Sequence, residues 1–251
     1  MKRIYLAAAC IAALGGIGVL GAVAATIPPN IAAAVANPNR PQADRDRDAL
    51  RKPAEVLALT GVKPGEQVLE LIPGGGYFTR ILSVAVGPKG HVTEGLPNLT
   101  GAADVAQKSN GVAADPNFSN VTEAHFTTDD LAKLGPVDLV WTSQNYHDLH
   151  LARFKLDVVG FDKAVYAALK PGGVFFIEDH AAKDGSGLDA PDKLHRIDEA
   201  VVKQEVESAG FKLVGESNIL RNPADDRTLL VFNPAIRGHT DQFLLKFQKP
   251  R

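Results

Sequence analysis

Short apolar segments alternate with segments of helical spacing along residues 44–251, and this alternation limits the possible folds more than any other feature. The strand-like segments cover residues 67–71, 91–94, 124–126, 137–142, 174–177, 211–214 and 243–247. Helices are expected over residues 44–59, 77–86, 161–169 and 194–209. Strands and helices that alternate at this spacing predict a doubly wound α/β sheet with mostly parallel strands.

The composition fits one globular domain and excludes several other classes. Of the 251 residues, 45% are hydrophobic and 22% are charged, which argues against intrinsic disorder. The formal net charge is −2, so we expect no nucleic-acid partner. The one cysteine, Cys10, cannot form an internal disulfide or build a cysteine-based zinc site. The charged residues of segment 44–52 are expected to form a solvated helix face.

The N-terminal residues predict export. Lys2 and Arg3 precede an uncharged apolar run from Ile4 to Ala25, which is the order found in secretory signals. Residues 1–25 are therefore expected to be a cleaved signal peptide or, in the alternative, an uncleaved anchor that would be the chain's only membrane contact. The mature protein would be periplasmic or secreted. Residues 26–43 contain four prolines and predict a linker before a domain over residues 44–251.

A glycine-rich turn, Pro73-Gly74-Gly75-Gly76, joins the strand at 67–71 to the helix at 77–86. Glycines at such a turn let a ligand approach the backbone, and the start of the helix offers free N–H groups. A tight turn that only packs the helix on the strand is the alternative. The turn lacks the G-x-G-x-x-G order, which argues against a nucleotide-dependent oxidoreductase.

Further motifs extend this pattern along the chain. They are Arg51–Leu57, Gly61–Gly65, Glu70–Thr79, Val137–Val140, Asn145–Asp148, Leu169–Gly173, Glu205–Phe211, Arg237–Gly238 and Thr240–Asp241. Through these motifs, residues 44–251 resemble the class I S-adenosylmethionine-dependent methyltransferases, in particular a group of exported predicted methyltransferases. The resemblance implies a seven-stranded Rossmann-like methyltransferase sheet and S-adenosyl-L-methionine as the cofactor.

The resemblance also assigns cofactor contacts. Glu70 ends the first strand, and Gly74, Gly75 and Gly76 bend around the methionine part of the cofactor. Glu94 would hold the ribose hydroxyls, since a carboxylate can accept from both. Asp129 would contact the adenine amine.

Three positions leave alternatives open. Counted from Gly90, the slot for the ribose acid falls on Leu96 rather than on Glu94. By register, the adenine position could fall on Thr127, and Asp129 could instead be a helix N-cap. Ile72 stands where the superfamily often has glycine, and its bulk could narrow the cofactor site.

The strand order that the resemblance implies places the glycine turn beside the loop after Trp141, where an acceptor would lie. His147 and His180 are candidate bases, because histidine titrates near neutral pH. Asn145 could orient the acceptor, and Tyr146 could stack on a ring or line the methyl path. The alternative is that these residues are helix caps and polar surface.

A metal site is the other possible use of these histidines. His147, His150 and Asp148 lie close in sequence, with His180 as a further ligand, but the spacing is not that of a known site, and we expect no metal. His195 would open the helix at 194–209 and either edge the pocket or lie on the surface.

The sequence therefore predicts methyl transfer from S-adenosylmethionine to an unknown, small-molecule acceptor. The alternative is a non-catalytic exported binding protein that retains the methyltransferase fold.

Overall fold

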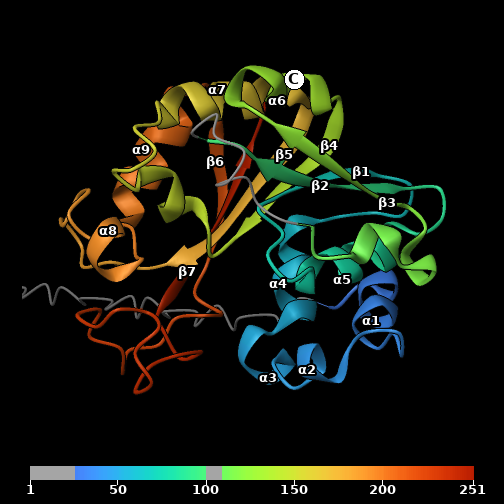
Figure 1. The fold of residues 1–251 in the computed structure, drawn as a ribbon, viewed down its shortest axis with the longest axis horizontal. Helices are drawn as coiled ribbons and strands as arrows, with labels where there is room; N and C mark the ends of the chain where they lie inside the picture. Colours follow the sequence, from blue (N-terminus) through green and yellow to red (C-terminus); the bar gives the residue numbers. More distant parts are fainter. Residues whose placement is uncertain (1–25, 100–108) are drawn as a thin grey trace, which may run out of the picture.

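The structure, a computed structural model, describes residues 26–99 and 109–251. Its centre is a seven-stranded sheet in the order β3-β2-β1-β4-β5-β7-β6 (Figure 1). The strands are β1 (Gln67–Leu71), β2 (His91–Pro97), β3 (Val121–Phe126), β4 (Val137–Ser143), β5 (Leu169–His180), β6 (Lys212–Ser217) and β7 (Gln242–Gln248). Strands β1 to β5 are parallel, and β7 is antiparallel to both neighbours. The predicted doubly wound, mostly parallel α/β sheet is confirmed.

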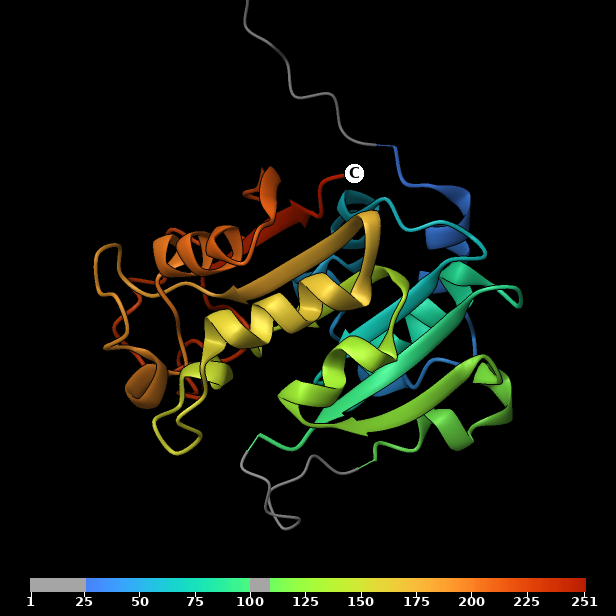
Figure 2. The same ribbon diagram turned by 90° about the horizontal axis from the view of Figure 1, so that it is seen from above.

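Helices cover both faces of the sheet. The α-helices are α1 (Pro29–Val35), α2 (Gln42–Arg45), α3 (Asp48–Arg51), α4 (Pro53–Thr60), α5 (Tyr77–Val86), α6 (Thr128–Leu131), α7 (Val158–Ala168), α8 (Pro191–Leu194) and α9 (Glu199–Ser208). Helices α7 and α9 pack on one face, which Figure 2 views from above, and α1, α4 and α5 pack on the other. Short 3-10 helices complete the connections: η2 (Val112–Ala114), η3 (Pro116–Phe118), η4 (Ala132–Leu134) and η5 (Tyr146–His150).

Trp141 anchors the face of the sheet under α5. Its ring is fully buried, stacks on Phe176 at a centroid distance of 5.2 Å and meets the edge of Phe78 at 4.6 Å. Aromatic pairs in these geometries add about 0.5–1.5 kcal/mol each beyond the area that they bury. This packing fixes α5, and hence the turn that precedes it, against β4.

The linker predicted over residues 26–43 is wrong for its first half. Residues 29–35 form α1, in which Ile31 and Ala34 are fully buried against α4 and α5. Pro28 and Pro29 do not prevent this helix, since proline is favoured at the first helical position. The ordered domain therefore begins before residue 44.

The helix predicted over residues 44–59 is divided into α2, α3 and α4. Lys52 has a left-handed backbone (φ 43°), and Pro53 begins α4 because its ring suits only the first turn of a helix. Likewise, the helix predicted from residue 194 begins only at Glu199, where the Asp198 side chain caps it. His195 is left-handed (φ 50°), and Ile197 forms an isolated parallel bridge with Ala181, the residue after β5, so this segment is not helical.

The predicted signal peptide or anchor, residues 1–25, lies outside the described residues. Within residues 26–99 and 109–251, none of the helices combines the length and the apolar character that a membrane crossing requires.

Candidate functional site

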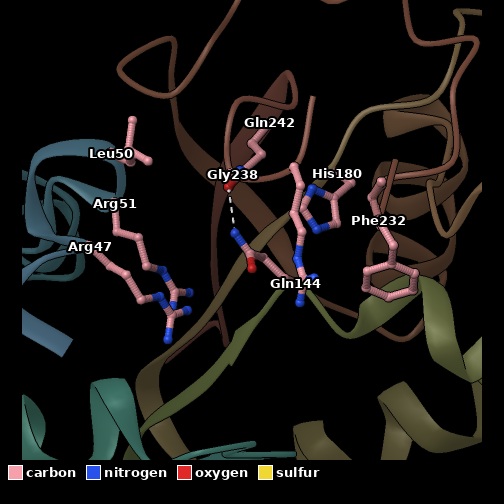
Figure 3. Close-up of a pocket in the computed structure, with 10 residues that line it drawn as sticks. Arg47, Leu50, Arg51, Gln144, His180, Phe232, Gly238 and Gln242 are labelled. Atoms are coloured by element: carbon pink, nitrogen blue, oxygen red, sulfur yellow. Dashed lines mark hydrogen bonds between the residues drawn. The ribbon is translucent and has the colours of Figure 1, made fainter. Parts of the chain in front are cut away.

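Two adjoining cavities lie at the carboxyl ends of β1, β4 and β5, where the strand order reverses. This is the edge at which open α/β sheets bind ligands. The smaller, about 170 Å³, borders the glycine turn, and we call it the glycine cavity. The larger, about 530 Å³, we call the arginine cavity (Figure 3); Arg47, Arg51 and Gln144 line both. The rest of the arginine cavity is lined by Leu50, His180, Val231, Phe232, Arg237, Gly238 and Gln242.

The glycines of the turn divide into two roles. Gly74 and Gly75 line the glycine cavity, and a Cβ atom added at either would meet no atom within 4 Å. A Cβ on Gly76 would instead come within 2.5 Å of Val112. Gly76 was expected to contact the cofactor, but it does not line the cavity: it is a packing residue that precedes α5 with a left-handed backbone (φ 75°). Gly74 and Gly75 leave backbone open to a ligand.

Ile72 also has a left-handed backbone (φ 56°). This is the position at which the resemblance to methyltransferases led us to expect glycine. This conformation is rare for a β-branched residue and costs about 1–3 kcal/mol. Two hydrogen bonds hold it in place: Ile72 N donates to Gly95 O (3.0 Å), and Ile72 O accepts from Asn145 Nδ2 (3.0 Å). The turn thus keeps the glycine-like geometry, with a bulky side chain on the wall of the glycine cavity.

Glu70 and Glu94 share one threonine beneath the turn. Thr79 Oγ1 lies 2.6 Å from Glu70 Oε2 and 2.9 Å from Glu94 Oε1. A hydroxyl carries one proton, so both contacts are hydrogen bonds only if one carboxyl group is protonated. Burial raises the pKa of Glu70 to about 8, which makes Glu70 the group that holds the proton at neutral pH. Glu70 also lines the glycine cavity, in agreement with the expected position.

Glu94 is fully buried and lines neither cavity. Its Oε1 also accepts from Asn110 Nδ2 (2.6 Å), which covers it from outside. The expectation that Glu94 holds a ribose is therefore corrected: no surface of its carboxylate is open to a ligand. Leu96, the other position considered, is buried too and offers no acceptor. The next residue on this side of β2 is Asn98, whose buried Oδ1 has no hydrogen-bond partner among the described residues.

Asp129 is exposed in the first turn of α6 and lines neither cavity. Thr127 is the N-cap residue of that helix, and Asp130 accepts from its hydroxyl (2.8 Å). Its contact with an adenine amine stays a prediction.

Asn145 and Tyr146 diverge after β4. Asn145 lines the glycine cavity and donates from Nδ2 to Ile72 O and Ser143 O, so it ties the two loops together. Tyr146 points into the core instead, where its hydroxyl lies 2.7 Å from Asp162 and 3.2 Å from Glu205. The predicted catalytic role of Tyr146 is wrong, because the turn of η5 directs it away from the cavities.

His180, at the end of β5, lines the arginine cavity, as expected for an acceptor-side residue (Figure 3). Its Nδ1 lies 2.8 Å from Thr240 Oγ1. Burial lowers the pKa of His180 to about 3, so the ring is neutral and only weakly basic. His180 can orient an acceptor by hydrogen bonding, but it is a poor general base at neutral pH.

His147 is buried behind His180 and lines neither cavity, contrary to its expected place beside the acceptor. Its Nδ1 lies 2.8 Å from Asp179 Oδ1, and its backbone N–H donates to Asp179 Oδ2 (2.7 Å). Burial disfavours the imidazolium, but the Asp179 charge and hydrogen bond outweigh it and raise the pKa of His147.

The outer face of His147 meets a second histidine and a carboxylate. Nε2 lies 3.2 Å from His195 Nδ1 and 3.4 Å from Asp148 Oδ1, and His195 Nδ1 is 3.4 Å from the same oxygen. The histidine considered at first, His150, turns away and bonds Glu205 (3.0 Å). Nitrogen and oxygen atoms this close could hold a metal ion.

Arginines are the part of the site that the sequence analysis missed. The segment 44–52 was interpreted as a solvated face, but Arg51 donates to Ser143 Oγ (2.6 Å) and lies over the Tyr77 and Phe78 rings at 4.4 and 4.7 Å. Arg47 extends beside it (Figure 3). The spacing of these two arginines, one helical turn apart, was the available signal.

The cavities carry excess positive charge. Arg47 makes no ion pair within the described part of the chain, and burial together with the neighbouring Arg51 lowers its pKa. Among the described residues, the carboxylate paired with Arg51 is that of Glu178, at 3.6 Å. Arg237 also lines the arginine cavity, and none of the described residues that line it is acidic. A bound anion would relieve this repulsion.

No family model and no curated protein matches the chain. Solved structures do. A methyltransferase from Aquifex aeolicus that depends on S-adenosylmethionine is 17% identical, with 81% of this chain and 98% of that chain covered and a TM-score of 0.54. A chain of the Haloferax volcanii complex that contains the Trm112 methyltransferase activator is 18% identical, with coverages of 90% and 100% and a TM-score of 0.56. The [4+2]-cyclase SpnF is 17% identical, with coverages of 83% and 81% and a TM-score of 0.53.

At these identities the likeness shows the fold. The chain has the fold of the class I S-adenosylmethionine-dependent methyltransferases, as the sequence resemblance implied. Because a [4+2]-cyclase has a similar fold, the reaction must be argued from the site itself.

Proposed function

We propose that this protein transfers a methyl group from S-adenosylmethionine to a small acceptor. The observation that carries the proposal is the glycine turn: Gly74 and Gly75 offer open backbone to a cavity that continues into a second, larger one. A cofactor in the first cavity would meet an acceptor in the second. Methyl transfer is an in-line displacement, for which alignment of two bound molecules is the main requirement.

The residues around the glycine cavity fit the amino-acid end of the cofactor. Asn145 and the open backbone at Gly74 and Gly75 would contact it, with Glu70 beneath. Arg47 and Arg51 line both cavities and lack a close carboxylate partner, so we assign them to the cofactor's carboxylate. A guanidinium binds a carboxylate in a bidentate manner, which would fix the cofactor's position.

The acceptor would occupy the arginine cavity. Its volume of about 530 Å³ suits a small molecule rather than a polymer, and its walls offer hydrogen-bonding groups from His180, Gln144 and Gln242. Gln144 Nε2 donates to Gln242 Oε1 (3.1 Å), which holds both amides at the cavity wall (Figure 3). Since His180 is a weak base, we expect the site to accelerate transfer by alignment more than by proton removal.

A non-catalytic binding protein of the same fold is the second candidate. It is favoured by the β2 side of the site, where both positions considered for the ribose acid, Glu94 and Leu96, are buried. Export, which the N-terminal sequence predicts, would also separate the protein from a cofactor that is made in the cytoplasm. Cell fractionation with N-terminal sequencing tests export to the periplasm or the medium, and full-length protein in the cytosol would contradict it.

Calorimetry with two ligands tests the proposed function. S-adenosylhomocysteine carries the carboxylate, whereas 5′-methylthioadenosine lacks the amino-acid end. Arg51→Gln should weaken binding of S-adenosylhomocysteine by about 1.5–3 kcal/mol, the contribution of a hydrogen bond to a charged group, and leave methylthioadenosine unchanged. The exposed Arg153, in neither cavity, gives the control variant Arg153→Gln. If the wild-type protein binds neither ligand, the non-catalytic function takes precedence.

A further inference from the structure

We propose that His147, Asp148 and His195 bind one divalent transition-metal ion, and that zinc fits the site best. The three candidate ligand atoms, His147 Nε2, His195 Nδ1 and Asp148 Oδ1, lie 3.2, 3.4 and 3.4 Å apart. Zinc binds histidine nitrogen and carboxylate oxygen at about 2.0–2.1 Å in tetrahedral geometry, which separates the ligand atoms by about 3.3–3.4 Å. The measured triangle is thus one face of a zinc-centred tetrahedron.

Asp179 orients the His147 ring so that, in its neutral form, Nε2 is the nitrogen free to bind a metal. Asp179 is fully buried, and its carboxylate lies 2.8 Å from His147 Nδ1. It also accepts hydrogen bonds from the backbone N–H groups of His147 and His180, at 2.7 Å each. An acceptor on Nδ1 leaves the lone pair of Nε2 free and aimed at the other two ligands. Histidine ligands in metal sites are oriented by carboxylates in this way.

The residues that follow His195 in the chain help to hold it in place. Its backbone is left-handed (φ 50°), a conformation that costs free energy unless the surroundings impose it. The next residue, Arg196, is fully buried and pairs with Asp225 at 2.8 Å, and Ile197 N donates to His180 O (3.0 Å). These anchors bring His195 next to His147, although 48 residues separate them in the chain.

The site is open on one side and borders the arginine cavity. The side chains of Asp148 and His195 are 27% and 26% exposed, so an ion can enter and keep a fourth position for water or another ligand. The His195 ring packs against Phe232, and the His147 ring lies 5.9 Å from that of His180. Phe232 and His180 both line the arginine cavity, so the ion would lie directly behind its wall.

Metal binding is tested on the full-length protein without cofactor or acceptor. Chelator-treated protein is titrated with Zn²⁺ by calorimetry, and with Co²⁺ by visible absorption, since tetrahedral Co²⁺ absorbs intensely. We expect one ion per chain, with low-micromolar or tighter affinity and an intense Co²⁺ spectrum. Asp179→Asn should weaken binding about 10–100-fold, and His195→Ala or Asp148→Asn by at least as much.

Two controls keep the test decisive. His150→Gln alters a histidine of the same 3-10 helix that faces Glu205, and it should bind the ion like the wild type. Circular dichroism and thermal melting of each metal-free variant separate lost binding from lost folding. The proposal is overturned if the wild type binds no ion, if His195→Ala binds like the wild type, or if His150→Gln loses as much affinity. None of these outcomes depends on whether the protein binds S-adenosylmethionine.

Discussion

The two sides of the switch point differ in what they offer a ligand. On the β4 and β5 side, polar residues from separate loops meet around two cavities. Of the two arginines that line both, Arg47 makes no ion pair with the described residues, and Arg51 has Glu178 at 3.6 Å. On the β2 side, both positions that we considered for the ribose acid, Glu94 and Leu96, are buried. The β4 and β5 side of this sheet edge therefore offers polar groups to a ligand, whereas the candidate residues on the β2 side are buried in the protein core. The fold places a ligand site at this edge, but each half must be tested for what it binds.

The largest effect is expected at the glycine turn, which lines the glycine cavity. Gly74→Val should reduce the affinity for S-adenosylhomocysteine at least about 100-fold, because a branched side chain would occupy the open approach and resist the left-handed backbone (φ 57°). Gly187 has nearly the same φ (56°), also faces open space and lines neither cavity. Gly187→Val therefore reproduces the backbone strain alone. Equal affinities in the two variants, measured by calorimetry, would remove the turn from the cofactor site.

A second prediction concerns the proton shared beneath the turn. The pKa of Glu70 is about 8 in the folded protein and near 4.5 when unfolded, so the native state binds the extra proton between these values. The contribution of Glu70 to the free energy of unfolding is therefore greatest below pH 4.5, and it falls as the pH rises to about 8. Glu70→Gln should remove this decline and add about 2–5 kcal/mol at pH 8.5, because each pKa unit corresponds to about 1.4 kcal/mol.

Denaturant unfolding between pH 5 and pH 9 measures this effect. The exposed Glu55 supplies the control variant Glu55→Gln, which should keep the wild-type slope. A Glu70→Gln protein that retains the wild-type pH dependence would mean that Glu70 is not the titrating group.

The sheet was predictable because its signals are local. The apolar run at 67–71 and the glycines that bound the helix at 77–86 gave the observed limits of β1 and α5. The elements that the sequence analysis did not predict depend on tertiary contacts. Ile197 has helical spacing in the sequence, yet its backbone pairs with Ala181, and α1 forms around prolines because α5 offers an apolar surface.

The site was predictable where a residue lies at or just beyond the carboxyl end of a strand. His180 ends β5, Asn145 comes two residues after β4, and both line cavities. The prediction for Tyr146 failed because adjacent residues of η5 point in different directions. The sequence analysis did not predict that His195 lies beside His147. The two residues are far apart in the chain, and their spacing does not indicate how the segment between them folds.

A third prediction sharpens the contrast on the β2 side. Asn98→Ala should weaken S-adenosylhomocysteine binding about tenfold, since its Oδ1, which has no hydrogen-bond partner among the described residues, is an acceptor beyond Leu96. Glu94→Gln should change affinity less than about twofold, because its carboxylate is buried under Asn110. Calorimetry on both variants, with thermal melting as the folding control, gives the answer. The reverse order would restore Glu94 as the ribose ligand.

The smallest effect is expected at Ile72, where the two sides meet. Ile72→Gly removes left-handed strain worth about 1–2 kcal/mol, but it also loses apolar packing and adds backbone entropy to the unfolded chain. These opposing contributions should leave the free energy of unfolding within about 1 kcal/mol of the wild type. The affinity for S-adenosylhomocysteine should rise a few-fold, because the side chain that narrows the glycine cavity is gone. Ile72→Ala is the matched variant: it shortens the side chain but keeps the strain, so it should gain affinity and lose stability. If both variants bind more weakly than the wild type, Ile72 is part of the binding surface, and its bulk has a function that glycine cannot supply.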